Sequence, residues 1–151
     1  MHGNLLGMAF LKQDKELAAL ADELGTFDAF AGLERRSLEA VAGSGRVVHL
    51  PSSWALISED TPADSVYVLL DGDTEVRHEG EVIASLGSGS LVGEAALVDR
   101  RRRNATVVTR TQVRALRLNY DDLPSLFGKH SDVEDVFRRE WERKAAGAAP
   151  V

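Results

Sequence analysis

The central part of the chain, from Arg46 to Leu118, divides into short β-type runs at regular spacing, with turn residues between them. Proline, glycine, serine and acidic residues mark the breaks at Pro51-Ser52-Ser53, Asp71-Gly72-Asp73 and Glu79-Gly80. We expect strands over 46–57 (broken at 51–53), 65–70, 74–77, 81–86, 105–109 and 113–118. Short strands joined by tight turns favour an antiparallel sandwich or a barrel-like roll.

Helical spacing of apolar residues is found on both sides of this β region. The expected helices span residues 10–24, 34–42, 121–129 and 132–146. Gly25 is placed to end the first of them, and Asp121 and either Ser131 or Asp132 are the expected N-caps of the last two. The predicted fold class is therefore α+β and mainly β: an antiparallel β-roll, or jelly-roll-like sandwich, with helices at both ends.

Composition narrows the functional classes. The chain has 151 residues, of which 44% are hydrophobic, and this is enough for one domain with a sizeable core. It has no cysteine for disulfides or thiolate zinc sites, and its 4 histidines lack the spacing of metal ligands. A formal net charge of −6 argues against nonspecific nucleic-acid binding. Since no nucleophile–base pair, secretory signal or membrane-length apolar run is found, we expect a cytoplasmic protein that is not an enzyme.

The most specific motif of the chain precedes the predicted strand at 105–109. It reads Gly93-Glu94-Ala95-Ala96-Leu97-Val98, and Arg103-Asn104-Ala105-Thr106-Val107 follows after a short insert. The N-terminus of a short helix offers free backbone N–H groups to an anion, and an arginine adds a planar fork suited to phosphate oxygens. A carboxylate beside the anion can accept hydrogen bonds from sugar hydroxyls. The motif therefore predicts one pocket for a phosphate and a ribose.

This stretch resembles the phosphate-binding cassette of cyclic nucleotide-binding domains, the modules that receive cAMP and cGMP. In that family the pattern is roughly Phe-Gly-Glu-x-Ala-Leu, a short insert, and Arg-x-Ala-Thr/Ser-Val. The resemblance extends over about residues 27–145, including the short helix that opens the domain at 27–33 and its Asp-x-hydrophobic-Tyr strand at 64–72. It implies a helical extension over 1–26, a cyclic nucleotide-binding domain over 27–146 with a short phosphate-binding helix, and a flexible tail over 147–151. Departures from the pattern are Val92, where an aromatic residue is usual, and the arginines at 100–102 in the insert.

The resemblance also implies a role for each cassette residue. Arg103 would bind the phosphate, and Glu94 would accept a hydrogen bond from the ribose 2′-hydroxyl. The full set of implied ligand-binding residues is Gly93, Glu94, Ala95, Ala96, Arg103, Asn104 and Ala105, with backbone N–H groups from the two alanines at 95 and 96. Ordinary roles stay open for two of them: a solvated arginine for Arg103, and a carboxylate at a positive helix end for Glu94. Asn104 can donate and accept, so it does not decide between adenine and guanine.

In function, the resemblance implies a regulatory sensor. The expected ligand is cAMP, with cGMP as the other candidate and no metal, and binding would shift the C-terminal helices between two arrangements. Because the chain stops after one further helix, without a helix-turn-helix, we expect the signal to pass to a separate protein partner or a second copy. Neither nucleic acid nor a membrane is an expected partner. The alternative is a scaffold module that keeps the fold without binding nucleotide, and the presence of Glu94 and Arg103 argues against it.

The last predicted helix carries an apolar stripe of Val133, Phe137 and Trp141 at i, i+4 and i+8. One interpretation is packing against the roll. The other is a mobile helix whose Phe137 or Trp141 caps the nucleotide base by stacking, a role that an aromatic ring suits.

Overall fold

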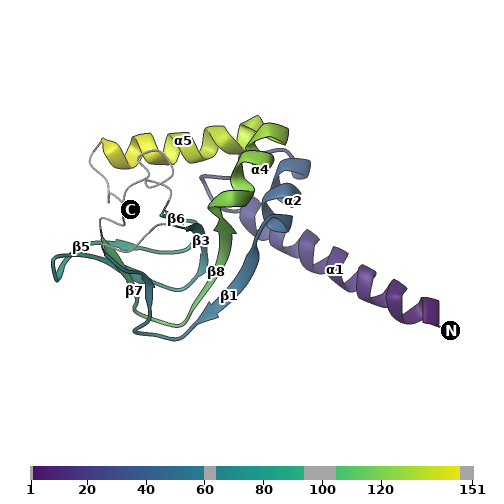
Figure 1. Cartoon of the computed structure of the whole chain (residues 1–151), viewed down its shortest axis with the longest axis horizontal. Helices are drawn as coiled ribbons and strands as arrows, with labels where there is room; N and C mark the ends of the chain where they lie inside the picture. The colour runs from purple at the N-terminus through teal and green to yellow at the C-terminus, as the bar shows by residue number, and fades with distance from the viewer. Residues whose placement is uncertain (1, 60–63, 94–104, 147–151) are drawn as a thin grey trace.

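The structure is a computed structural model that describes residues 2–59, 64–93 and 105–146. Its β region consists of two four-stranded antiparallel sheets, with strand orders β1-β8-β3-β6 and β2-β7-β4-β5 (Figure 1). The strands are β1 (Arg46–Leu50), β2 (Ala55–Ile57), β3 (Ser65–Asp71), β4 (Thr74–His78), β5 (Glu81–Leu86), β6 (Leu91–Val92), β7 (Thr106–Thr109) and β8 (Val113–Asn119). The predicted roll is confirmed, and the predicted strands agree with these bounds to within one residue once 46–57 is divided at its proline turn.

Strand β6 was not predicted from the sequence. It has only two residues, and it follows the run Gly87-Ser88-Gly89-Ser90, which is typical of a loop. It pairs with β3, where Tyr67 lies opposite Val92. Because β3 lies more than twenty residues earlier in the chain, no local pattern indicates this pairing.

Several of the turns between strands contain a residue with positive φ. Glu79 and Gly80 join β4 to β5, and both have positive φ, 51° and 84°, as a two-residue type I′ hairpin turn requires. Between β3 and β4, Gly72 adopts a φ of 100°. Ser53, in the turn between β1 and β2, has a φ of 61° although it is not glycine.

Sheet β1-β8-β3-β6 separates two apolar clusters. Along β3 the side chains alternate: Val66, Val68 and Leu70 join the cluster shared with the helices, whereas Leu69 joins the cluster between the two sheets. The sheet is therefore covered on both faces, which explains why β3 reads as a nearly continuous apolar run.

The helices of the described residues are α1 (His2–Gly25), α2 (Arg35–Gly43), the 3-10 turn η1 (Tyr120–Asp122), α4 (Leu123–Lys129) and α5 (Ser131–Ala145). Helix α1 projects away from the roll, and it begins at His2 rather than at the predicted residue 10 (Figure 1). Residues 27–33 form consecutive turns rather than the helix expected there, with Phe30 N donating to Phe27 O at 3.0 Å. No helix in the described ranges is long and apolar enough to cross a membrane.

Two of the expected N-caps are wrong. The N-cap positions of α4 and α5 are Asp122 and His130, and neither makes a side-chain capping hydrogen bond. Asp121 lies inside η1, which extends the helical segment by one turn. The carboxylate of Asp132, in the first turn of α5, accepts a hydrogen bond from Val133 N at 3.0 Å and another from the Ser37 hydroxyl of α2 at 2.6 Å. It therefore combines a local contact with a long-range one.

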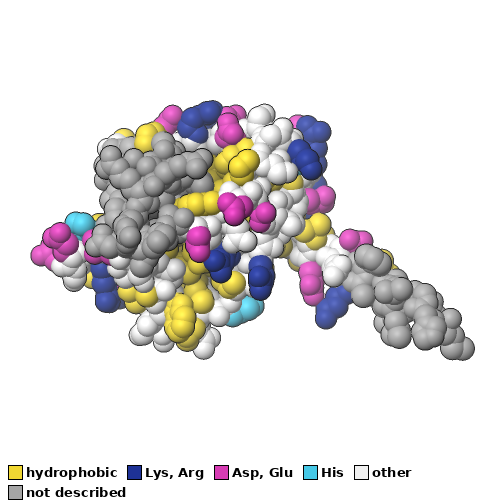
Figure 2. Space-filling model, in the orientation of Figure 1, with side chains coloured by type: hydrophobic (Ala, Val, Ile, Leu, Met, Phe, Trp, Pro, Cys, Tyr) yellow, Lys and Arg dark blue, Asp and Glu magenta, His cyan; other side chains and the backbone are white. Residues whose placement is uncertain are grey.

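An ion pair between Glu23 and Arg114 holds the C-terminal end of α1 against the roll. Glu23 of α1 accepts two hydrogen bonds from Arg114 of β8, one of them 2.9 Å from Nη1 to Oε1. This hydrogen bonding to Glu23 raises the pKa of the Arg114 guanidinium above its usual value. Figure 2 shows acidic and basic side chains on the outer surface over α5. Ion pairs within this helix join Arg138 to Asp135 and Arg143 to Glu140.

Candidate functional site

The predicted cassette joins the two sheets. Gly93 follows β6 of one sheet, and Ala105 precedes β7 of the other. Both residues are buried, Ala105 with 0% exposure. Five of the predicted ligand residues, Glu94, Ala95, Ala96, Arg103 and Asn104, lie outside the described residues. The structure therefore defines where the cassette starts and ends.

The start of the cassette has a backbone that only glycine adopts easily. Gly93 has a φ of 95°, in the left-handed region where a Cβ would be strained. Its carbonyl oxygen accepts a hydrogen bond from the Tyr120 hydroxyl of η1, at 2.7 Å. No sequence pattern indicated Tyr120, because it stands 27 residues from Gly93.

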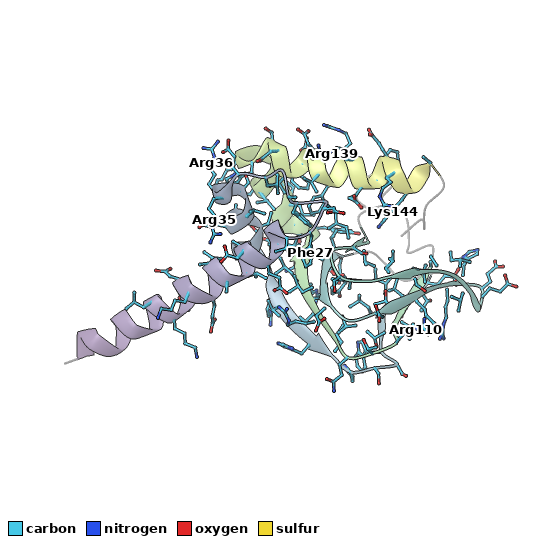
Figure 3. All side chains as sticks on the ribbon, turned by 180° about the vertical axis from the view of Figure 1, so that it is seen from behind. Phe27, Arg35, Arg36, Arg110, Arg139 and Lys144 are labelled. Carbon is cyan, nitrogen blue, oxygen red and sulfur yellow. The ribbon has the colours of Figure 1, made fainter. Side chains whose placement is uncertain are left out.

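A buried lysine lies beside the same strand. Lys144, in the last turn of α5, is 3% exposed, and its ammonium donates to the Leu91 carbonyl oxygen of β6. Figure 3 shows its side chain directed from α5 toward the roll. The sequence did not indicate this residue either, because a lysine near a helix C-terminus usually stays in solvent.

The two predicted base-capping residues have different surroundings. Phe137 is 4% exposed and packs edge-on against Phe127, with ring centroids 5.1 Å apart. It belongs to the cluster shared by the helices and the roll, as does Val133. Trp141, one turn further along α5, is half-buried and is not part of that cluster. Capping by either residue stays a prediction, and for Phe137 it would require leaving the core.

The described residues offer two further observations on ligand chemistry. They contain no cluster of three histidine, cysteine or acidic side chains able to hold a metal ion. A groove of about 720 Å³ lies between the 26–32 turns, residues 88–90 and α5, and neither Gly93 nor Ala105 lines it. The groove is thus separate from the ends of the cassette.

Comparison with known proteins gives the family directly. The family model "Cyclic nucleotide-binding domain" matches residues 47–130, which include the whole cassette and most of the roll. The cAMP-dependent protein kinase regulatory subunit of Aspergillus fumigatus is 35% identical over 102 residues, covering 66% of this chain and 24% of that protein. The chain therefore spans about a quarter of the length of the regulatory subunits that it matches.

A bacterial regulator and a solved structure agree with this match. The CRP-like cAMP-activated global transcriptional regulator of Mycobacterium tuberculosis is 22% identical over 120 residues, covering 76% of this chain and 54% of that protein. The solved structure described as "Sp-2Cl-cAMPS bound to PKAR CBD2" superposes with a TM-score of 0.77 at 21% identity, covering 88% of this chain and 89% of that one. At that identity the likeness concerns the fold. From the roll, the cassette between its sheets and the family match, we conclude that this chain belongs to the cyclic nucleotide-binding domain family.

Proposed function

We propose that the protein binds cAMP in the cassette and acts as a regulatory sensor. The observation that carries the proposal is the complete Gly-Glu and Arg-x-Ala-Thr-Val pattern at 93–107, within the part of the chain that the family model matches. The names of the matched relatives support the choice of ligand, since one is the regulatory subunit of a cAMP-dependent protein kinase and another is a cAMP-activated regulator.

The chemistry of the proposed residues suits a cyclic phosphodiester. Arg103 supplies a guanidinium whose fork matches two phosphate oxygens, and Glu94 supplies the acceptor for the ribose 2′-hydroxyl. The four consecutive arginines at 100–103 would also give a net negative protein a local positive field, which speeds the arrival of an anionic ligand.

The proposed mechanism is a change of arrangement, with no chemical step. Binding at the cassette would change the free energy of docking of the C-terminal helices, and these would present or withdraw a surface for a protein partner or a second copy. Helix α5 is the element proposed to move, because its last turn contacts the strand that leads into the cassette.

Isothermal titration with cAMP, cGMP and 2′-deoxy-cAMP tests the proposal. We expect cAMP to bind, and 2′-deoxy-cAMP to bind more weakly because it lacks the hydroxyl that Glu94 would accept. Equal affinity for the deoxy compound would contradict the role of Glu94. Absence of heat with both cAMP and cGMP at millimolar concentration would favour the scaffold alternative.

A further inference from the structure

A second hollow lies where α2 turns into β1, beside the end of β8. Its volume is about 340 Å³, and the described residues that line it are Ser44, Gly45, Arg46, Arg117 and Asn119. That volume is near the lower limit of ligand pockets, which span about 300–1,000 Å³. Neither Gly93 nor Ala105 lines it, so the hollow is separate from the ends of the cassette.

The pairing of β1 with β8 brings the two arginines of the hollow together. Arg46 lies directly opposite Arg117 in the antiparallel register, so both side chains leave the same face of the sheet. Asn119 stands two residues further along β8 and shares that face, because side chains alternate along a strand. Three side chains that donate hydrogen bonds therefore border one small hollow.

The charges of this pair are poorly balanced by its surroundings. Arginines directly opposite each other repel, and like charges in that position destabilise a sheet. Asp64 Oδ2 lies 3.5 Å from Arg117 Nη2, but the two side chains are 73% and 41% exposed, so this ion pair contributes little stability. Arg46 makes no hydrogen bond or ion pair with any other residue that the structure describes. The pair therefore favours an additional anion.

Several donors of the hollow are available to such an anion. Arg117 Nε donates to the Ser65 hydroxyl at 3.3 Å, and Nη2 faces Asp64, whereas Nη1 makes no hydrogen bond within the described ranges. Asn119 precedes η1, yet its side chain makes no capping hydrogen bond. The Ser44 hydroxyl is different, because it already donates to the Ala40 carbonyl oxygen at 2.6 Å. Arg46, Arg117 and Asn119 are thus the candidate ligand residues.

The number of donors indicates the class of anion. A guanidinium fork matches two oxygens of a carboxylate or of a phosphate. A carboxylate has only two oxygens, and one fork occupies both. A phosphate monoester has three acceptor oxygens and a charge of about −1.5 to −2 at pH 7, so it can accept from both arginines and from the amide. The hollow therefore suits a phosphate monoester better than a carboxylate.

We propose that Arg46, Arg117 and Asn119 form a second anion site, which binds the phosphate group of a monoester or free phosphate. This site goes beyond the proposed function and does not depend on it. A cyclic phosphodiester is a poorer match, because it carries one negative charge and offers two free oxygens. The phosphate can come from solution or from a phosphorylated side chain of a partner protein, and both sources present the same group to the arginines.

Titration of the ¹⁵N-labelled full chain, followed by NMR, tests the site. The probes are inorganic phosphate, a short peptide with one phosphoserine, the same peptide without phosphate, and acetate, all at one ionic strength set with sodium chloride. Each titration is made without cAMP and with saturating cAMP. We expect both phosphate probes to shift the backbone amides of 44–46 and 117–119 and the arginine Nε–Hε signals in both arms. Acetate should bind about tenfold more weakly, and the unphosphorylated peptide should cause no shift.

The relative affinity of the two phosphate probes identifies the source of the ligand. Tighter binding of the phosphoserine peptide would indicate a phosphorylated partner, and tighter binding of inorganic phosphate would indicate a small ligand from solution. Either result supports the site. Equal affinity for acetate and phosphate would refute the phosphate assignment.

Three variants assign the binding to the two arginines. Arg46→Gln and Arg117→Gln should each weaken phosphate about tenfold, which corresponds to about 1.4 kcal/mol. Arg36→Gln removes an equal charge from α2, where the exposed Arg36 pairs with Glu34, and it should stay within about twofold of wild type. If Arg117→Gln does not fold, Arg46→Gln decides, because Arg46 has no described partner whose loss would unfold the domain.

Two results would overturn the site. One is wild-type phosphate affinity in Arg46→Gln. The other is a set of phosphate-induced shifts that lies outside 44–46 and 117–119, or that disappears with saturating cAMP, since phosphate would then be bound in the cassette. If the wild type binds neither cAMP nor cGMP, the proposed function fails, and the titrations without cAMP still judge the second site.

Discussion

Gly72 shows how closely one residue can determine a turn in this roll. Its φ is 100°, and a Cβ added there would lie 2.3 Å from the Gln112 carbonyl oxygen. Gly80 has a similar φ of 84°, but a Cβ there meets nothing within 4 Å. A comparison of the two positions therefore distinguishes the cost of backbone strain, which both would have, from the cost of steric overlap, which only Gly72 would have.

Replacement of each glycine by alanine should lower the free energy of unfolding by different amounts. For Gly80→Ala we expect about 1–2 kcal/mol, the cost of a left-handed backbone in a residue with a Cβ. Gly72→Ala should lose about 3 kcal/mol or more, because overlap with a backbone oxygen adds to that strain. Urea denaturation measures both values. Equal losses would show that the β3–β4 turn can shift to make room.

Arg103 is the cassette residue whose loss should matter most to binding. Removing one partner of a desolvated charge pair costs about 2–5 kcal/mol, so Arg103→Ala should weaken cAMP roughly 30- to 3,000-fold. Arg101→Ala removes a charge two residues away, and it should have a smaller effect, seen mainly at low salt. Titration of both variants makes the comparison. Similar losses at the two positions would mean that the phosphate ligand is not Arg103.

At the scale of elements, α5 combines two kinds of contact along its length. Its first half contributes Val133, Val136 and Phe137 to the core, all nearly inaccessible to solvent. Its second half carries the half-buried Trp141 and the buried Lys144.

Phe137→Ala and Trp141→Ala should therefore behave differently. Loss of a buried phenylalanine costs about 3–5 kcal/mol, so Phe137→Ala should be strongly destabilised in thermal and urea unfolding. Trp141→Ala should remain close to wild-type stability and weaken cAMP about tenfold, or about 1.4 kcal/mol, as expected when an aromatic ring that stacks on a base is lost.

Fluorescence provides an independent measurement on the same element. In a Trp54→Phe background, Trp141 is the only indole, and saturating cAMP should shift its emission. Unchanged emission together with wild-type affinity in Trp141→Ala would assign this residue to packing alone.

At the scale of the whole molecule, the cassette joins one sheet to the other, and the helical segment 120–145 contacts the residues leading into it. A ligand held between these parts should stabilise the domain as a unit. A ligand that binds the folded state and not the unfolded state raises the free energy of unfolding, by an amount that follows from mass action.

Saturation with cAMP should raise the melting temperature. At a free ligand concentration about a hundredfold above Kd, linkage gives about 2.7 kcal/mol, which corresponds to a shift of roughly 5–10 °C for a domain of this size. Differential scanning fluorimetry measures the shift, with 5′-AMP as the control nucleotide. A shift of the same size with 5′-AMP would contradict selectivity for the cyclic phosphodiester.

The sequence by itself determined the features that depend on neighbouring residues. Alternating apolar residues and turn signals such as Glu79-Gly80 located most strands and the hairpin between β4 and β5, because side-chain period and turn conformation are local properties. The spacing of Gly93-Glu94 from Arg103 identified the family in the same way, since the cassette is one continuous stretch of chain.

Only the tertiary structure decided which side chains meet across the fold. The Lys144–Leu91 contact joins residues 53 apart, and the Ser37–Asp132 contact joins residues 95 apart. Strand β6 likewise exists through its pairing with β3. A lysine, a serine or a two-residue strand has no local pattern that predicts burial, because burial depends on what the rest of the chain places beside it.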